Sequence, residues 1–261
     1  MTTTETKADA KAEAEAKERE LAMAARTEEA KALLKELFNA GVHLGHDTKE
    51  WDPKMHDYIF DTKGSTHIIN LSITVNNLMH AADFLKKQAR LGRNILYVGT
   101  SKQTSAICKS EAERAEVFFI NQRWLGGLIT NFDTIRARLN KLRELELQKE
   151  TGGFENYGKK EVARLNRQIS KLNKSLGGLK KMRGRPEVIV VFDQVKDKIA
   201  VIEAQKVKAS LVALTDTNCD PSGVDFVIPA NDDSMRSINV IAKYLSNAII
   251  EGAAASNKRR Y

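Results

Sequence analysis

The stretch VIVVF at residues 188–192 decides the fold, because it is an uninterrupted apolar run in which four of the five side chains are β-branched. Such short runs form strands that are buried on both faces, as in the interior of a parallel sheet. Comparable runs recur along the chain, at residues 94–98, 117–120, 211–214 and 226–228. A further strand, HIINL at residues 67–71, is expected to open the same sheet.

Helical patterns lie between these runs. We predict helices over residues 73–91, 102–114, 199–207 and 234–251. A short amphipathic helix is expected to begin near Arg26 and to end at Gly41, which occupies the position of a C-terminal cap. Strands that alternate with helices indicate a sheet covered on both sides. The predicted fold class is therefore α/β, with a doubly wound, mostly parallel sheet.

A long interruption separates the strand that ends at Ile120 from the strand that begins at Val188. Its second half carries apolar residues at three-four spacing, namely Val162, Leu165, Ile169, Leu172, Leu176 and Leu179. Its first half offers a matching face with Ile135, Leu142 and Leu145, and the pair Gly152-Gly153 lies between the halves. The spacing predicts an antiparallel coiled-coil hairpin inserted into the sheet domain.

This pattern divides the chain into four parts. Residues 1–25 are rich in Ala, Glu and Lys and are expected to be disordered or a fraying helix. Residues 26–130 and 186–252 form the predicted globular domain, residues 131–185 the inserted hairpin, and residues 253–261 a basic tail. The first 30 residues are too acidic for a transit peptide and lack the apolar core of a secretory signal, so we expect them to be retained.

Positive charge is concentrated in the predicted hairpin. The whole chain has 42 Lys and Arg against 34 Asp and Glu, a net excess of eight. Residues 121–185 alone hold 16 Lys and Arg against six Asp and Glu, so the rest of the chain is slightly acidic. Clustered cations favour a polyanionic partner, because counterion release rewards charges held along one phosphate backbone. A solvated helical face is the alternative explanation of this charge.

Other features argue against several classes of protein. Only Cys108 and Cys219 are present, with no metal-binding spacing, so neither a disulfide framework nor a cysteine zinc site is indicated. No apolar run approaches the roughly 20 residues that a membrane-spanning helix requires, and a soluble protein with no membrane partner is expected. No nucleophile elbow, glycosidase-type carboxylate pair or Cys beside a general base is visible, which disfavours an enzyme.

The turn VGTSK at residues 98–102 follows a predicted strand and opens a predicted helix. Backbone N–H groups and the helix dipole can hold a phosphate in this geometry. The spacing is not that of a Walker A loop, so a bound nucleotide, an RNA phosphate and a plain structural turn all stay open.

A second candidate site combines histidines with aspartates. His43 and His46 flank Gly45, and a group of acids follows the last predicted strands, namely Asp216, Asp220, Asp225, Asp232 and Asp233. Histidine and carboxylate ligands suit zinc or magnesium. The alternative is that the acids cap helices or turns and that the histidines are half-buried polar groups with local partners.

The segment NQRWLGGLITNF at residues 121–132 precedes the basic hairpin. Arg123 and Asn131 could contact phosphate or sugar, and the pair Gly126-Gly127 would allow a close approach of the backbone. Trp124 could stack on a base or anchor the root of the hairpin in the core.

Several motifs in one order resemble a known family. GVHLGH at residues 41–46, WDPKM at residues 51–55 and HIINL at residues 67–71 look like the opening of ribosomal protein S2 of the bacterial-type small subunit. Later motifs resemble that family in sequence and spacing, at residues 121–132, 175–178, 216–221 and 228–233. The resemblance covers about Leu33 to Gly252.

The resemblance implies a flavodoxin-like domain with a protruding helical hairpin, acting as a structural constituent of the small ribosomal subunit in the cytoplasm. It implies no reaction, no small-molecule substrate and no required cofactor. The implied partners are small-subunit rRNA near the junction of head and body and neighbouring small-subunit proteins, including the mRNA-binding ribosomal protein S1, which the family helps to recruit. Positions at which a divalent ion, zinc or magnesium, is suspected in the family match His43, His46, Asp216, Asp232 and Asp233.

The leading hypothesis is that the chain binds rRNA without catalysing a reaction. The side chains expected to contact phosphate or sugar are Lys54, Lys63, Lys102, Arg123, Asn131, Arg136, Arg138, Lys141, Lys180, Lys181, Arg183, Arg185 and Arg236. Two alternatives stay open. One is an enzyme of nucleotide or phosphosugar type that uses residues 99–102, and the other is a protein–protein scaffold in which the hairpin seam binds a partner helix.

Overall fold

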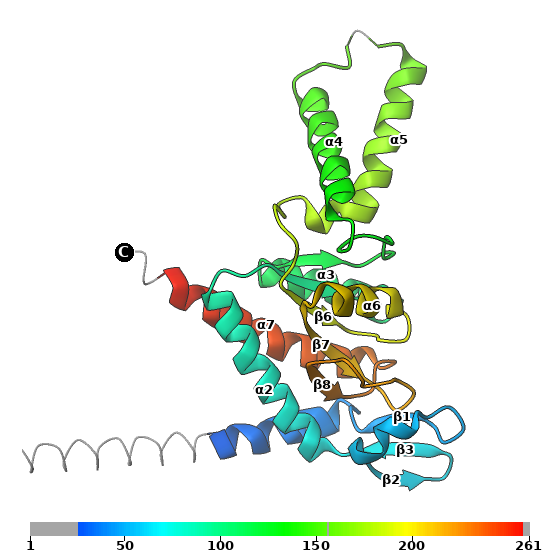
Figure 1. Ribbon diagram of the computed structural model, residues 1–261, viewed down its shortest axis with the longest axis vertical. Coiled ribbons are helices and arrows are strands. Elements are labelled where there is room, and N and C mark those ends of the chain that lie inside the picture. The colour runs from blue at the N-terminus through cyan, green and yellow to red at the C-terminus, as the bar shows by residue number, and fades with distance from the viewer. Residues whose placement is uncertain (1–25, 156, 258–261) are drawn as a thin grey trace, which may run out of the picture.

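A parallel sheet of five strands forms the centre of the protein, whose computed structural model describes residues 26–155 and 157–257 (Figure 1). The predicted leader over residues 1–25 and the last four residues of the predicted tail lie outside the described residues. The strands are β4 (Ile95–Val98), β5 (Phe118–Ile120), β6 (Val188–Val191), β7 (Ser210–Thr215) and β8 (Phe226–Pro229). They pair in the order β5-β4-β6-β7-β8, which in chain order is 2-1-3-4-5. The predicted α/β class is confirmed, and the strand order is compatible with a flavodoxin-like fold.

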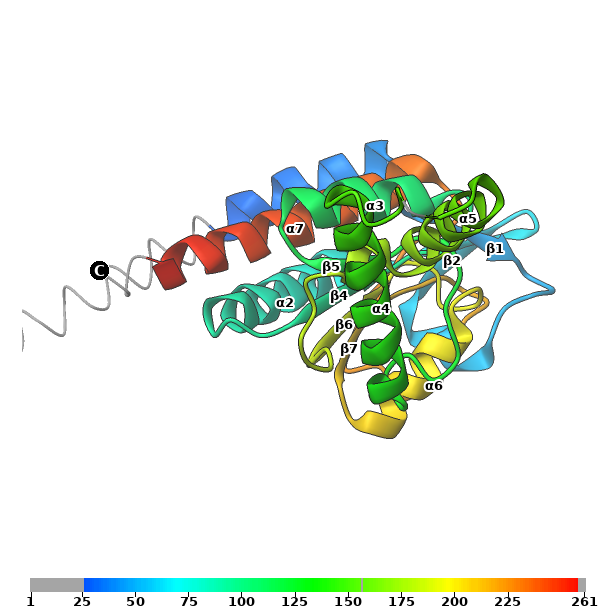
Figure 2. The same ribbon diagram turned by 90° about the horizontal axis from the view of Figure 1, so that it is seen from above.

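The sheet separates two apolar cores because its side chains alternate between its faces. In β6, Val188 and Val190 join the core under α2 (Leu71–Arg90), α3 (Thr104–Arg114), α7 (Met235–Asn257) and the helical residues 26–39. Ile189 and Val191 join the other core, under α6 (Lys198–Val207) and the root of the hairpin. Figure 2 shows α3 and α7 on one side of the strands and α6 on the other. Both faces are therefore covered, as a doubly wound sheet requires.

The helix that covers residues 26–39 ends as the sequence predicts. Gly41 has a φ of +76°, and its N–H donates to the carbonyl of Phe38, while the N–H of Val42 donates to the carbonyl of Leu37. This pair of bonds is the Schellman arrangement, in which glycine is favoured because it enters the left-handed region without a Cβ clash.

The predicted strand at residues 67–71 does not belong to the parallel sheet. Its residues form β3 (Thr66–Ile69), which lies between β1 (Leu44–Asp47) and β2 (Ile59–Lys63) in a separate antiparallel sheet. Between β1 and β2 runs the short 3-10 helix η1 (Pro53–Tyr58). Asn70 caps α2 by accepting from the N–H of Ser72, so the strand ends at Ile69, two residues earlier than predicted. The prediction was wrong because the apolar pattern of HIINL does not specify its partner strand.

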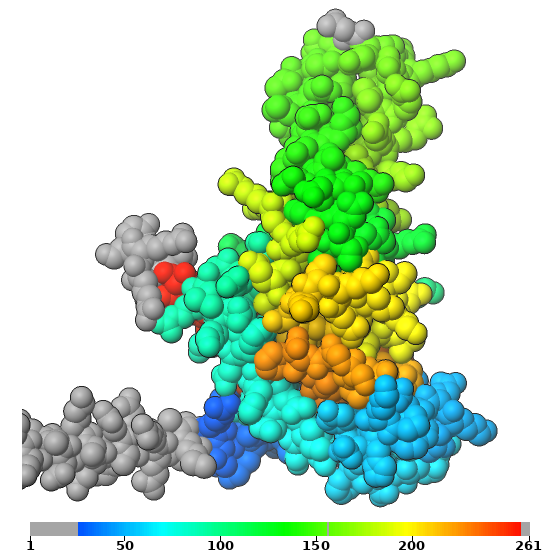
Figure 3. Space-filling model, in the orientation of Figure 1, coloured from blue at the N-terminus to red at the C-terminus, as the bar shows by residue number. Residues whose placement is uncertain are grey.

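Two helices project from the sheet domain where the long interruption was predicted, α4 (Phe132–Glu150) and α5 (Lys159–Leu176) (Figure 1). In space-filling view they stand at the opposite end of the molecule from the three-stranded sheet (Figure 3). A small apolar cluster of their own, Leu142, Leu145, Phe154 and Ile169, lies between them. Coiled-coil packing along the whole seam stays a prediction.

The chain returns to the sheet through the 3-10 turn η2 (Gly177–Leu179). A Cβ at Gly178 would collide with the backbone carbonyl oxygen of Phe119 in β5. Glycine at this position therefore allows the root of the hairpin to lie directly against the edge strand. Within residues 26–155 and 157–257, no helix is both long and apolar enough to cross a membrane.

Candidate nucleic-acid interface and metal site

The projecting helices carry their cations on the outside. Of the 16 Lys and Arg in residues 121–185, all are exposed except Lys180, which is partly buried. Their apolar side chains face the partner helix, with Leu142 fully buried and Ile169 only 7% exposed. The amphipathic spacing of each helix therefore leaves the basic side chains free to meet a partner.

Some predicted contacts are tied to neighbours within the protein. Arg136 pairs with Asp133 at 2.9 Å and Lys141 with Glu144 at 3.5 Å, each within one turn of α4. Exposed pairs of this kind contribute little stability and exchange readily for other anions. Arg123, Asn131 and Arg138 are exposed at the base and along α4.

The segment after α5 is bound to α4. Lys180 Nζ lies 2.7 Å from Glu146 Oε1, and the guanidinium of Arg143 donates to the backbone carbonyl of Lys180. Lys181, Arg183 and Arg185 follow in the same segment with exposed side chains. The structure therefore brings the cations of residues 180–185 to the root of the hairpin, as one group.

The remaining predicted contacts lie elsewhere. Lys54 Nζ is 2.7 Å from Asp220 Oδ2, and Lys63 ends β2 in the three-stranded sheet. Lys102 is exposed just before α3, and Arg236 is exposed in the first turn of α7. These four residues stand apart from the hairpin, so the structure does not gather all the predicted contacts on one surface.

Trp124 is an anchor for the hairpin root. It is 7% exposed, packs in the core under α6, and donates from Nε1 to Glu203 Oε1 at 3.0 Å. The same carboxylate accepts from the backbone N–H groups of Gly127, Ile129 and Thr130 at 2.8–3.2 Å. It also accepts from the hydroxyl of Thr130 at 3.1 Å. These bonds hold the pKa of Glu203 below its usual value despite burial.

The turn at residues 98–102 is occupied by the protein's own groups. Thr100 donates from its N–H to Asp197 Oδ2 at 3.1 Å and from its hydroxyl to Asp197 Oδ1 at 2.7 Å. The N–H of Ser101 donates to Thr104 Oγ1 at 3.1 Å. Burial raises the pKa of Asp197 to about 6. A phosphate here would have to displace a carboxylate from its donors, so the geometry favours the plain structural turn.

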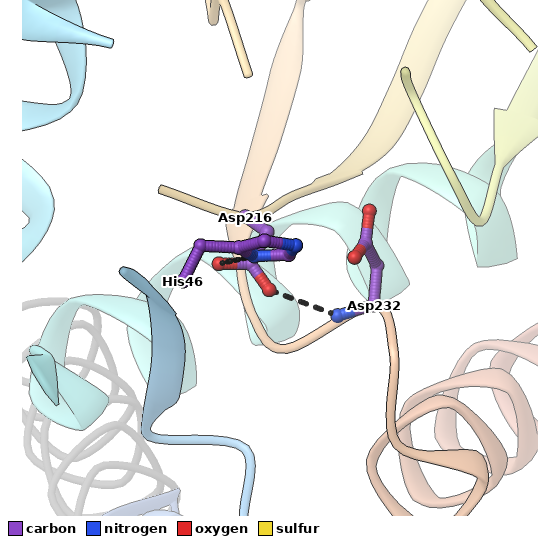
Figure 4. A group of neighbouring side chains, drawn as sticks. All are labelled: His46, Asp216 and Asp232. Carbon is purple, nitrogen blue, oxygen red and sulfur yellow. Dashed lines mark hydrogen bonds and ion pairs between the residues drawn. The ribbon is translucent and has the colours of Figure 1, made fainter. Parts of the chain in front are cut away.

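His46, Asp216 and Asp232 form the candidate metal site. His46 comes from β1, Asp216 follows β7 and Asp232 follows β8, and one ligand atom from each lies within 4.8 Å of the others. Figure 4 shows the Asp216 carboxylate against the ring of His46, with Nδ1 and Oδ1 3.2 Å apart. The backbone N–H of Asp232 donates to Asp216 Oδ2 at 3.2 Å. Asp233 adds an exposed carboxylate 3.3 Å from His46 Nε2.

Crowding of acids changes the protonation of this group. Burial and the nearby Asp216 carboxylate raise the pKa of Asp232 to about 8. The hydrogen bond that His46 donates to the Asp216 carboxylate raises the pKa of His46 to about 9. At neutral pH His46 is therefore protonated and Asp232 neutral, so a metal ion would have to displace protons from both residues.

His43 lies outside this group. Its ring stacks on Phe38 with centroids 4.6 Å apart, and its buried Nδ1 has no hydrogen-bond partner among residues 26–155 and 157–257. Burial lowers the pKa of His43. Gly45 in β1 allows this strand to approach the segment that carries Asp216, because a Cβ at position 45 would come within 2.7 Å of Thr217 Cγ2.

Sequence reasoning missed two acids at the carboxyl edge of the sheet and the carboxylate that holds the hairpin root. Asp193 directly follows the VIVVF run, and Asp197 follows four residues later, so the run itself was the signal. Glu203 lies at helical spacing between the buried Ala200 and Ala204, which places it on the buried face of α6. The spacing was available, but nothing local indicates five donors 73 to 79 residues away in the chain.

A comparison with protein families places these features in context. The sequence model of the family described as ribosomal protein S2 matches residues 37–252. The match covers both sheets, the projecting helices and the His46 group.

Proposed function

The chain belongs to the ribosomal protein S2 family, whose members are structural constituents of the small ribosomal subunit and not enzymes, and from this premise we propose how it binds rRNA. The contact surface in this proposal is the outer, cationic side of α4 and α5 together with residues 180–185 at their root. Membership of the family implies a ribosome-bound protein of the cytoplasm whose partners are rRNA and other small-subunit proteins.

One observation carries the proposal. Residues 121–185, which comprise the two projecting helices and the segments that flank them, hold an excess of ten positive charges, and 15 of the 16 cations are exposed. Cations arranged along a projecting arm can follow a phosphate backbone, and each contact releases condensed counterions. The Glu203 carboxylate supports this use by fixing the root of the arm to α6. An arm held at a fixed angle loses less entropy when it binds.

We also propose that the rRNA contact lies near the junction of head and body and that the protein helps to recruit ribosomal protein S1. An exposed apolar side chain outside the arm favours the second part of this proposal, a contact with another protein. Phe60 in β2 is 73% exposed, on a sheet that stands at the opposite end of the molecule from the arm (Figure 3). A partner that covers Phe60 would remove a large apolar surface from water without competing with RNA on the arm.

A divalent ion bound by His46, Asp216 and Asp232 is part of the proposal, with Asp233 as an outer carboxylate. One imidazole nitrogen and two carboxylates suit zinc better than magnesium, which prefers oxygen ligands alone. Zinc titration followed by calorimetry at pH 6 and pH 9 should show binding that strengthens with pH, because the ion displaces protons. Equal heats for the protein and for an Asp216→Asn variant would exclude this site.

The test of the rRNA proposal is sedimentation with small subunits that have been washed free of their own copy of this protein. The variant replaces Arg138, Lys181 and Arg183 with Gln, and the control replaces the exposed Lys35, Lys49 and Lys196 in the same way. Both variants lose three charges. We expect the logarithm of the binding constant, plotted against the logarithm of salt concentration, to become shallower by about 3 for the hairpin variant only. Equal slopes for the two variants would contradict the proposal.

A further inference from the structure

A second basic surface lies at the amino-terminal edge of the parallel sheet, away from the outer faces of α4 and α5, and shares only Arg185 with the cationic segment at the root of the arm. Arg93, Arg185 and Lys208 line one hollow of about 450 Å³ together with Glu187. The three cations are exposed and come from three connections, those that precede β4, β6 and β7. Figure 3 shows the segment around residues 180–187 beside the end of α2 on one side of the molecule.

We propose that this hollow binds a second stretch of rRNA backbone, so that the protein holds RNA with its sheet domain as well as with its arm. The inference rests on the proposed function, because it names a further contact for the same partner. Arg185 is the one residue of the three that the sequence predicted as an RNA contact.

The single acid in the hollow is already used within the protein. Glu187 Oε2 accepts from the backbone N–H of Asn94 at 2.7 Å, and Oε1 lies 3.5 Å from Arg93 Nη1. Three cations against one engaged carboxylate leave the hollow positive. Phosphate oxygens suit such a site, because guanidinium groups donate in a fork that matches them.

The opposite edge of the same sheet carries a group of carboxylates. Four buried or partly buried carboxylates gather where the strands end, on Asp193, Asp197, Asp216 and Asp232. The sheet is therefore polarised, with cations at its amino edge and carboxylates at its carboxyl edge.

The cations at the amino-terminal edge of the sheet are only partly explained by their position at helix ends. Lys87 and Arg90 lie in the last turn of α2 and Lys206 in the last turn of α6, where cations complement the helix dipole. Arg185 belongs to no helix, since it lies between η2 and β6. Its place in the hollow therefore needs another reason.

Lys208 has a backbone conformation that is unusual for a lysine. It is the C-cap of α6 and adopts a φ of +55° and a ψ of +37°, a left-handed conformation in which glycine is the usual residue. A lysine there costs conformational free energy that a glycine would not. Glu116 after α3 also has a positive φ, so the strain alone does not indicate a ligand; Lys208 matters here because it lines the hollow with Arg93 and Arg185.

Directed cleavage of rRNA tests the placement. An iron chelate is attached to Lys208→Cys or, as the control, to Ile199→Cys near the other end of α6, and each labelled protein is added to small subunits washed free of their own copy. The native Cys108 and Cys219 are buried, and burial raises the pKa of both thiols, so the new cysteine is labelled selectively.

We expect hydroxyl radicals from position 208 to cut rRNA and those from position 199 to cut it weakly or not at all. Sedimentation without cleavage from position 208, or a crosslink there to protein only, would overturn the inference and leave the proposed function standing. Failure of the unmodified protein to sediment with small subunits would overturn the proposed function, and the inference with it.

A single substitution separates binding from folding. Lys208→Gly relieves the left-handed strain and removes the cation, so the melting temperature should stay equal or rise while the salt dependence of binding becomes shallower by about 1. The control Lys198→Gln removes an exposed cation from the first turn of the same helix and should change neither quantity. Unchanged salt dependence in Lys208→Gly would contradict the proposal.

Discussion

Replacement of Glu203 by Gln should loosen the root of the projecting helices. The carboxylate is 6% exposed and accepts five hydrogen bonds from residues 124–130, at distances of 2.8–3.2 Å. In the variant an NH2 group replaces one of the two oxygens and faces the donors on that side, whichever way the amide turns. At least two buried donors then lose their acceptor.

The magnitude follows from these contacts. A hydrogen bond to a charged group contributes about 1.5–3 kcal/mol, and bonds that share one carboxylate are not additive. We expect Glu203→Gln to lower the free energy of unfolding by about 2–3 kcal/mol, and Glu203→Ala to lower it by about 3–5 kcal/mol. For a chain of this length the Gln variant should melt roughly 5–10 °C lower.

Urea unfolding at several pH values is the assay. The folded-state pKa of Glu203 is lowered, so its stabilisation is present above the unfolded value of 4.5 and is lost as the pH falls through the folded value. The difference in free energy of unfolding between the native protein and the Gln variant should therefore reach its full value at pH 7 and shrink below about pH 4. The control Glu113→Gln changes an exposed glutamate in α3 and should alter stability by less than about 0.5 kcal/mol. A Glu203→Gln variant as stable as this control at pH 7 would refute the reasoning.

Three further outcomes test other parts of the structure. Burial raises the folded-state pKa of Asp197 to about 6 from an ordinary 3.8, so between pH 4 and pH 7 the native protein should lose about 2 kcal/mol of stability relative to Asp197→Asn. Urea unfolding measures this loss, and parallel pH profiles of the two proteins would exclude it. Gly178→Ala should lower the free energy of unfolding by about 1–3 kcal/mol, and with it the melting temperature, because the new Cβ clashes with Phe119. The control Gly184→Ala, whose Cβ would have its nearest contact 3.7 Å away, should leave the melting temperature unchanged. Histidine titration by NMR should give His46 a pKa of about 9 that falls in Asp216→Asn, and an unchanged value would show that the hydrogen bond is not its cause.

The strands of the central parallel sheet could be predicted from the sequence, but those of the three-stranded sheet mostly could not. Every strand of the parallel sheet is an apolar run, because both of its faces are buried, and the VIVVF run stands out for this reason. In the three-stranded sheet, β2 exposes four of its five residues and offers no such run. Short, exposed strands are specified by tertiary pairing, so their periodicity is absent from the sequence.

The candidate site shows a similar division. The sequence placed Asp216 and Asp232 after the last predicted strands, and in the structure a ligand atom of each lies within 4.8 Å of the other. The sequence could not distinguish His43 from His46, and only the fold shows that His46 in β1 faces the acids while His43 stacks on Phe38. The basic hollow at the amino edge joins Arg93, Arg185 and Lys208, which lie far apart in sequence, so only the fold reveals it.

A reconstruction of the small ribosomal subunit with this chain bound is the most direct test of how the protein works. We expect the outer faces of α4 and α5 and the side chains of residues 180–185 to lie against rRNA phosphates, with the three-stranded sheet turned away from them. A map in which the two helices extend into solvent, without nucleic acid within reach of their Lys and Arg side chains, would contradict the account.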